Sequence, residues 1–410
     1  MATARAISLR WRLTGAVYLC CTLYLLFQGG KTALMLFVIL NVLLLYLALG
    51  RLSGIGRVKG ERRLGGNAGP HTPVLSAGSK LEVELDIRIP GFWPVPYVLV
   101  QDTLERTGGQ PMMFEVSFIP DFRRTGSVHY STPPLQRGWY TFRKTECVTR
   151  DIFGLFEHRG SIDSVQRFTV LPQTEPIRQW HRVERGLKGP YAYAVSNRFS
   201  KETTQINGVR EYIYGDRLSR IHWNATAKTG EWKSKEFDRE SVPRTVIVLD
   251  RCGTAYVNAD HFELAVSIAA SLVEYGIRRE TAMGIVSSGA TADGFLPRST
   301  AEQRQLILNH LVGVQADGTA GLYRSLRQSP LLIPRGSFVV LVTPHSGEEV
   351  VRTMEWLDRS GNTPCLIHLP GERSRAETSG WQRMLTARGW PVYNVRTLAE
   401  LPAALEGGGR

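Results

Sequence analysis

Two uncharged apolar stretches near the N-terminus constrain the fold of this chain more than any other feature. Residues 13–28 read LTGAVYLCCTLYLLFQ, residues 32–49 read TALMLFVILNVLLLYLAL, and only Gly29, Gly30 and Lys31 separate them. A helix needs roughly 17 to 25 apolar residues to cross the hydrocarbon core of a bilayer, so both stretches are close to long enough. We therefore predict a transmembrane hairpin within residues 1–59, with helices at about 13–30 and 32–50.

The basic residues around the hairpin predict its orientation. Both outer flanks are basic, whereas the turn holds a single lysine: the flanking residues are Arg5, Arg10, Arg12, Arg51, Arg57, Lys59, Arg62 and Arg63. By the positive-inside rule, both ends of the hairpin lie in the cytoplasm. A cleaved signal peptide fits less well because no small-residue cleavage site precedes the second stretch. A buried helical pair in a soluble core is the other alternative. We expect a two-pass plasma-membrane protein with both termini and the soluble domains in the cytoplasm.

The distribution of charge argues against a general nucleic-acid function. The 410 residues carry a net charge of +13. Residues 1–63 hold nine basic residues and one acidic residue, and residues 178–244 hold 14 basic and eight acidic residues. The first excess is explained by the membrane flanks. The second mixes both signs, which favours ion pairs or a protein surface over a phosphate track, so nucleic-acid binding through residues 178–244 is the weakest hypothesis.

Residues 60–73, GERRLGGNAGPHTP, are rich in glycine and proline and predict a linker. Beyond them, apolar and polar residues alternate with the period of two that is typical of strands. The alternating runs are separated by turn residues and span 81–89, 113–119, 127–131, 139–144 and 167–171. We expect an antiparallel β-sandwich over residues 74–172.

The following segment, residues 173–244, contains VREYIYGDRLSRIHWNATAKTGEWKSKEFDRE at positions 209–240. Gly215 and Asp216 form a turn signal, which predicts a strand, a turn, a short helix and another strand. On such a helix Asp216 and Arg220 are four residues apart and can pair. His222 has no second histidine nearby to form a zinc site, and no phosphate-binding glycine motif is present. Ser219 lies three residues before His222, which is a weak signal for nucleophilic catalysis.

The stretch REYIYGDRLSRIHWNATAKTG, preceded by RGWYTF and RDIFGLF, closely resembles the bacterial membrane-anchored family called domain of unknown function 58. The resemblance covers nearly the whole chain. Its signature positions, which we treat as candidates for partner binding, are Arg210, Tyr212, Gly215, Asp216, Arg220, His222, Trp223 and Lys228. The alternative is that they build the junction between the soluble domains. The resemblance implies a MoxR-type AAA+ ATPase as partner, and also a membrane protein with a transglutaminase-like domain.

Residues 245–410 alternate between apolar strands and amphipathic helices. Strands are predicted at 245–250, 281–288, 337–343, 364–369 and 391–395, with helices at 261–275, 301–311, 348–359 and 380–387. This order is typical of a parallel, doubly wound sheet. Ligands bind such sheets beyond the carboxyl ends of the strands, where this chain places Asp250, Arg251, Cys252, Ser287, Thr343 and His345.

An aspartate that closes the first strand also makes this domain resemble a von Willebrand factor A domain. That resemblance implies Mg²⁺ held by an Asp-x-Ser-x-Ser loop. Here the loop reads Asp250-Arg251-Cys252-Gly253-Thr254, and a cysteine replaces the first serine. Asp250 and Thr254 remain the candidate metal ligands. Because Mg²⁺ prefers oxygen to sulfur, we expect Asp250 to cap a loop or pair with a basic residue, and we expect no metal or other cofactor.

These features predict a multidomain α+β protein: a transmembrane helical hairpin, an antiparallel β-sandwich and a doubly wound, von Willebrand factor A-like α/β domain. The motif has no catalytic spacing, so the leading hypothesis is a non-enzymatic, membrane-tethered assembly or protein-interaction factor. The alternative is a membrane-bound, hydrolase-like enzyme that uses the strand ends around Asp250 and Cys252.

Overall fold

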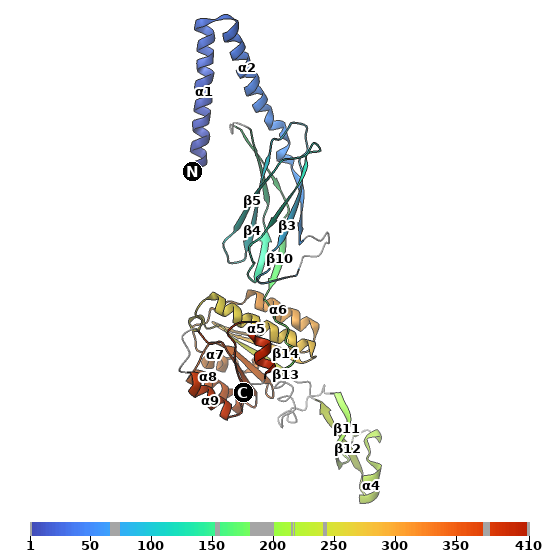
Figure 1. Ribbon diagram of the computed structural model, residues 1–410. Coiled ribbons are helices and arrows are strands. Elements are labelled where there is room, and N and C mark those ends of the chain that lie inside the picture. Colours follow the sequence, from blue (N-terminus) through green and yellow to red (C-terminus); the bar gives the residue numbers. More distant parts are fainter. Residues whose placement is uncertain are drawn as a thin grey trace. The chain divides into compact units, whose positions relative to one another are not determined.

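The computed structural model describes residues 2–65, 74–151, 156–180, 201–214, 216, 218–240, 244–371 and 378–407. The chain divides into a first unit, Met1–Leu171, and a second unit, Pro172–Arg410. Each unit has its own sheet or sheets and its own hydrophobic core (Figure 1). The protein is therefore described as two folded parts.

The first unit begins with two antiparallel helices, α1 (Ala2–Gln28) and α2 (Gly30–Leu49). Gly29 joins them with a φ of 56°, a left-handed conformation that suits glycine. The helices contact each other through Tyr18, whose hydroxyl donates to the Asn41 side-chain oxygen at 3.3 Å. The two predicted helices are thus confirmed as helices, but α1 starts about ten residues earlier than the apolar pattern indicated.

One of these helices has the length and composition of a membrane span. Among the described residues, Gly30–Leu49 is apolar over 20 residues with a mean hydropathy of 2.6, and 11% of it is buried within the protein. The apolar part of α1, Arg12–Gln28, is shorter. The structure therefore supplies one candidate span near the N-terminus.

Two mainly antiparallel sheets follow the helices, and the one parallel pairing among their described strands is that of β2 with β10. The smaller has the order β1-β3-β6 and consists of β1 (Lys59–Leu64), β3 (Glu82–Arg88) and β6 (Thr125–Ser131). The larger has seven strands in the order β2-β10-β7-β4-β8-β9, with β5 paired to β4. Its strands are β2 (Leu75–Ser76), β4 (Val98–Arg106), β5 (Met112–Phe118), β7 (Gly138–Phe142), β8 (Thr145–Arg150), β9 (Glu157–Ile162) and β10 (Gln166–Leu171).

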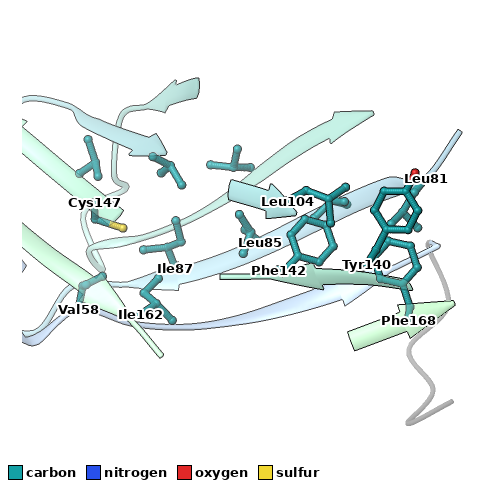
Figure 2. Packing of buried hydrophobic residues seen from close by; sticks show 14 of the residues in the cluster. Val58, Leu81, Leu85, Ile87, Leu104, Tyr140, Phe142, Cys147, Ile162 and Phe168 are labelled. Carbon is teal, nitrogen blue, oxygen red and sulfur yellow. The ribbon is translucent and has the colours of Figure 1, made fainter. Parts of the chain in front are cut away.

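Both sheets contribute to a single hydrophobic core (Figure 2). Alternate residues of β3, including Leu85 and Ile87, point into this core because successive side chains of a strand face opposite ways. On the other sheet, the ring of Phe168 packs against Tyr140 at 5.4 Å and against Phe142 at 5.8 Å between centroids. Burial of each large side chain contributes roughly 1.5–3 kcal/mol, so this cluster is the main source of stability in the first unit.

The structure corrects the predicted linker. Residues 60–64 belong to β1, which pairs with β3 along its whole length, from Lys59 opposite Arg88 to Leu64 opposite Val83. Residues 66–73 lie outside the described residues. Arg62 points into the domain, where its side chain has no exposed surface and forms an ion pair with Asp102. It therefore does not act as a membrane-flanking charge, and a buried ion pair explains why a glycine- and charge-rich segment forms a strand.

The second unit contains a six-stranded sheet in the order β15-β14-β13-β16-β17-β18. Its strands are β13 (Arg244–Asp250), β14 (Ala282–Ser288), β15 (Ala292–Arg298), β16 (Phe338–Thr343), β17 (Thr363–His368) and β18 (Val392–Asn394). Five strands are parallel, and β15 forms an antiparallel edge that the sequence pattern did not predict. The five predicted strands of this region are confirmed.

Helices cover both faces of this sheet (Figure 1). α5 packs on the sheet and on α6, whereas α7, α8 and α9 share the second core cluster with Val246 and Val248 of β13. The helices are α5 (Ala259–Arg278), α6 (Ala301–Gly313), α7 (Leu322–Gln328), α8 (Glu348–Arg359), α9 (Thr378–Ala387) and α10 (Glu400–Glu406). The strand order places a topological switch between β13 and β16, because the chain adds strands on opposite sides of β13.

Candidate functional site

The signature residues lie in a small module at residues 201–240. The strands β11 (Lys201–Glu211) and β12 (Lys233–Glu240) pair antiparallel, and between them are the 3₁₀ helix η4 (Leu218–Arg220) and helix α4 (Trp223–Thr229). The predicted succession of strand, turn, helix and strand is confirmed. His222 caps the N-terminus of α4, since its Nδ1 accepts a hydrogen bond from the Ala225 amide at 3.1 Å.

The predicted pairing of Asp216 with Arg220 is replaced by another ion pair. Arg210 donates to Asp216 at 2.7 Å, and the Ile213 amide donates to the same carboxylate at 3.2 Å. These two hydrogen bonds, with that from Arg210 first, lower the pKa of Asp216. The helical spacing did not apply because residues 218–220 form a 3₁₀ turn and α4 begins only at Trp223.

Asp216 instead closes the loop that enters the module. The Tyr212 hydroxyl also donates to the Asp216 carbonyl oxygen at 3.3 Å, so Arg210, Tyr212 and Asp216 form one group. Gly215 lies outside the described residues, as do residues 152–155 of the second motif. The role of this group is to hold the loop in shape.

The surface of the module is aromatic. Trp223 is 64% exposed and Trp232 is 53% exposed, with their ring centroids 6.2 Å apart. The Tyr212 ring also lies beside Trp232, with 5.8 Å between the ring centroids. We call these three residues the aromatic cluster. The signature motif includes Tyr212 and Trp223 but not Trp232, although Trp232 directly precedes the second strand.

The aromatic cluster is bordered by apolar and charged groups. A surface pocket beside Trp232 is lined by Tyr212, Leu218 and two acidic residues, Glu211 and Glu231. Lys233 lies between those acidic residues, at 3.5 Å from Glu211 and 3.3 Å from Glu231. Further exposed apolar side chains of the module are Val209, Ile213, Tyr214 and Leu218. Lys228 lies on the exposed side of α4, and Arg220 is partly buried.

A second candidate site lies at the switch between β13 and β16. Asp250 ends β13 and is 1% exposed. One carboxylate oxygen accepts from the Thr343 hydroxyl at 2.6 Å and the other from the Cys252 amide at 2.9 Å. His345 Nε2 lies 3.5 Å from the first oxygen, and His345 Nδ1 lies 3.7 Å from Glu349. These residues form a chain of carboxylate, imidazole and carboxylate, in which burial raises the pKa of Asp250.

The other strand-end residues are engaged separately. Arg251, next to Asp250, pairs with Asp317 and lies 3.6 Å from Asp293. Ser287, the last residue but one of β14, is fully buried, with its hydroxyl 2.7 Å from His310 Nε2. Burial lowers the pKa of His310, and the nearby Arg251 lowers it further. A fully buried serine cannot reach a substrate in this conformation, so this pair resembles a structural contact more than a nucleophile and its base.

The donors around Asp250 do not suit Mg²⁺. Both oxygens of Asp250 are already hydrogen-bonded, and an imidazole lies beside one of them. The Cys252 sulfur contacts the Thr254 hydroxyl at 3.3 Å. A sulfur atom, which is a poor ligand for Mg²⁺, thus occupies the place of the first serine in the loop. As expected for a loop cap, Asp250 binds the Cys252 amide, while Arg251 pairs elsewhere. We assign no chemical step to a metal here.

The module and the α/β sheet define a class of chain in which a short motif hairpin precedes a doubly wound domain. Residues 208–358 match the family model described as "Protein of unknown function DUF58". The "Uncharacterized protein YeaD" of Bacillus subtilis (strain 168) is 24% identical over 327 residues, which are 77% of this chain and 76% of that protein. Residues 208–358 of the chain are therefore similar to the DUF58 family, in agreement with the resemblance that the signature indicated.

Solved structures show more distant similarity. Proximal thread matrix protein 1 from the mussel byssus is 14% identical, with a TM-score of 0.31 over 40% of this chain and 46% of that one. The SpRpn10 VWA domain is 13% identical, with a TM-score of 0.30 over 39% of this chain and 94% of that one.

Proposed function

We propose that this protein is a membrane-tethered protein-interaction or assembly factor and that its aromatic cluster binds the partner. The observation that carries the proposal is the exposure of Trp223 and Trp232 next to each other on a small hairpin. Exposed apolar patches of this kind mark interaction sites, and tryptophan is the residue type most enriched among those that dominate binding energy.

The charges around the aromatic cluster favour a protein partner. Glu211, Glu231 and Lys233 surround Trp232 with both signs of charge. A protein interface typically has an apolar centre and a polar rim, whereas a phosphate-binding surface needs a consistent positive potential. The family resemblance favours a MoxR-type AAA+ ATPase as the partner, with a transglutaminase-like membrane protein as a further member of the assembly.

The membrane attachment is part of the same proposal. Support comes from the apolar helix Gly30–Leu49 and from α1, whose apolar part Arg12–Gln28 packs beside it. We infer a two-pass hairpin in the plasma membrane with both termini and both soluble units in the cytoplasm. Without Arg62, the flank after α2 still holds Arg51, Arg57, Lys59 and Arg63, so the positive-inside argument stands.

The same proposal includes finer descriptions of the two soluble folds. We interpret the two mainly antiparallel sheets around one core as a β-sandwich, and the α/β unit as von Willebrand factor A-like. The support for the second is the parallel order around β13 together with an aspartate at its end. Domains of this architecture bind ligands at the switch between strands. In this proposal the Asp250 site binds a ligand and does not catalyse a reaction.

Copurification from membranes tests the proposal. The full chain would be extracted in mild detergent, and proteins that accompany it would be identified by mass spectrometry. We expect an AAA+ ATPase whose recovery falls at least about tenfold in Trp223→Ala and Trp232→Ala, because truncating such residues costs 2 kcal/mol or more. Asp216→Ala should reduce recovery by loosening the loop, and Arg220→Ala tests a second charged residue of the signature.

The matched control is Trp139→Ala, since Trp139 is 44% exposed on β7, outside the module. Loss of the partner with Trp139→Ala to the same degree would show that the aromatic cluster is not the binding surface. A preparation with no protein partner but with hydrolytic activity abolished by Asp250→Ala would overturn the proposal in favour of an enzyme.

A further inference from the structure

A pocket lies in the first unit where α2 ends against the strands. Its apolar wall includes Tyr46 and Leu47 of α2 and Trp93 and Val95 of the loop before β4, and its volume is about 140 Å³. The Tyr46 and Trp93 rings lie 5.3 Å apart. This space has room for a small polar headgroup but not for a folded protein segment.

Two buried polar atoms in this pocket have no hydrogen-bond partner among the described residues. They are Ser53 Oγ, on a residue 3% exposed, and His158 Nε2. Burying a polar atom without a partner is costly, so such atoms point to a group that the protein binds there. A serine hydroxyl and an imidazole N–H can both donate to a phosphate oxygen. The charged residues in the pocket lining are Arg150, which pairs with Glu157 at 2.8 Å, and Asp151.

The pocket is held open by the chain itself. Arg124 has a left-handed backbone, with a φ of 60°. Its guanidinium donates to the carbonyl oxygens of Ile89, at 3.0 Å, of Trp93 and of Ser53. One side chain thus joins the loop that carries Trp93 to the turn that carries Ser53. The two walls are fixed before any ligand binds, which reduces the entropic cost of binding.

We propose that this pocket binds the phosphate headgroup of a phospholipid from the bilayer that α2 enters. The inference rests on the membrane attachment proposed above. Tyr46 and Ser53 lie on either side of the C-terminal end of the apolar helix Gly30–Leu49, which is the depth of the headgroups for a spanning helix. Tyrosine and tryptophan are enriched at that depth, where Tyr46 and Trp93 would contact the first carbons of the acyl chains.

The test uses the full chain in two steps. Carbonate extraction of membranes first measures whether the chain is integral. The purified, delipidated chain in non-ionic detergent is then titrated with dihexanoyl phosphatidylglycerol, and binding is followed by the rise in unfolding temperature. We expect saturable binding that Ser53→Ala and His158→Leu each weaken by about tenfold, since each removes a hydrogen bond to a charged group.

Three controls decide the outcome. Ser161 lies on the same strand as His158 but is exposed, so Ser161→Ala should leave binding unchanged. Without lipid, Ser53→Ala should unfold at the same or a higher temperature, because it removes an unpartnered polar atom; a structural role would lower that temperature. Inorganic phosphate and dihexanoyl glycerol should bind at least tenfold more weakly than the phospholipid.

Equal binding of inorganic phosphate would make this an anion site, and equal binding of dihexanoyl glycerol would make it an apolar pocket; either result overturns the proposal. An integral chain that does not bind the phospholipid would refute the headgroup site and leave the membrane attachment intact. A chain released by carbonate would refute both.

Discussion

Asp102 and Asp250 are buried carboxylates, each 1% exposed, but they are stabilised in different ways. Asp102 on β4 receives two hydrogen bonds from the Arg62 guanidinium, at 2.7 and 3.1 Å, and others from Tyr130 and Thr145. Asp250 has a hydroxyl and an amide as partners, and His345 Nε2 lies 3.5 Å from one of its oxygens.

The difference separates Asp102, which belongs to a structural ion pair, from Asp250, whose raised pKa makes its contribution to stability depend on pH. The buried Arg62–Asp102 ion pair joins β1 of the smaller sheet to β4 of the larger. Asp250 has no guanidinium partner among the described residues, and burial raises its pKa. It also lies where doubly wound sheets bind ligands.

The largest effect on stability is expected when the buried Arg62–Asp102 ion pair is broken. Arg62→Met leaves Asp102 buried without a cation and should destabilise the first unit by about 3–5 kcal/mol. Amide hydrogen exchange in β1 and β4 of the full chain would measure this loss, since it separates the two units. The double variant Arg62→Met with Asp102→Leu should recover much of the stability.

The neighbouring arginine is the matched control for that experiment. Arg63 lies on the same strand but is exposed, at 3.1 Å from Asp86. Arg63→Met should cost less than about 1 kcal/mol, because water screens exposed pairs. Similar losses for the two arginine variants would refute the structural role assigned to the buried pair.

A smaller effect is expected at the second carboxylate. Thr343→Val removes the hydroxyl that donates to Asp250 and that accepts from the His345 amide at 3.0 Å. Leaving these buried groups unsatisfied should cost about 1–3 kcal/mol, measured as faster hydrogen exchange in β13 and β16. Thr343→Ser keeps the hydroxyl and should be much milder. If both variants lose the same stability, packing rather than the hydrogen bond is responsible.

The smallest effect is expected to be a dependence on pH. Burial raises the pKa of Asp250 above its ordinary value of 3.8, so the folded state binds its proton more tightly than the unfolded state. The contribution of this group to stability is therefore full below pH 3.8 and is lost as the pH rises through the raised pKa. Asp250→Asn should flatten that part of the stability curve of the second unit. A wild-type curve that rises with pH in this range, with the same slope in Asp250→Asn, would contradict the assignment.

The missed strands show what sequence patterns cannot supply. On β4 the inward positions are Val98, Val100, Asp102 and Leu104, so a charged residue interrupts the apolar alternation. On β1 the inward residue is Arg62. A buried charge by itself argues against a buried strand. Arg62 and Asp102 are tolerated in the core because they form an ion pair with each other. The alternation of β3 and β10 is uninterrupted, and those strands were predicted.

The candidate sites show the same limit. Motifs in the sequence indicated Asp216, Trp223 and Asp250 as candidate site residues. The hydrogen-bond partners of Asp216 and Asp250 are seen only in the structure. Asp216 pairs with Arg210 through the loop rather than with Arg220 along a helix. Glu349 and Trp232 carried no motif that distinguished them from surface or core residues.

The sequence by itself determined the apolar helices at the N-terminus, the alternation of strands and helices after residue 244, and the signature module. These depend on periodicity and local turns, which neighbouring residues encode. The tertiary structure alone decided which buried charges meet. Arg62 and Asp102 are 40 residues apart, and Asp250 and Thr343 are 93 apart. Periodicity predicts which face a side chain occupies, but its partner depends on how distant strands pair. That pairing gave Asp102 a guanidinium partner and left Asp250 with a hydroxyl and an amide.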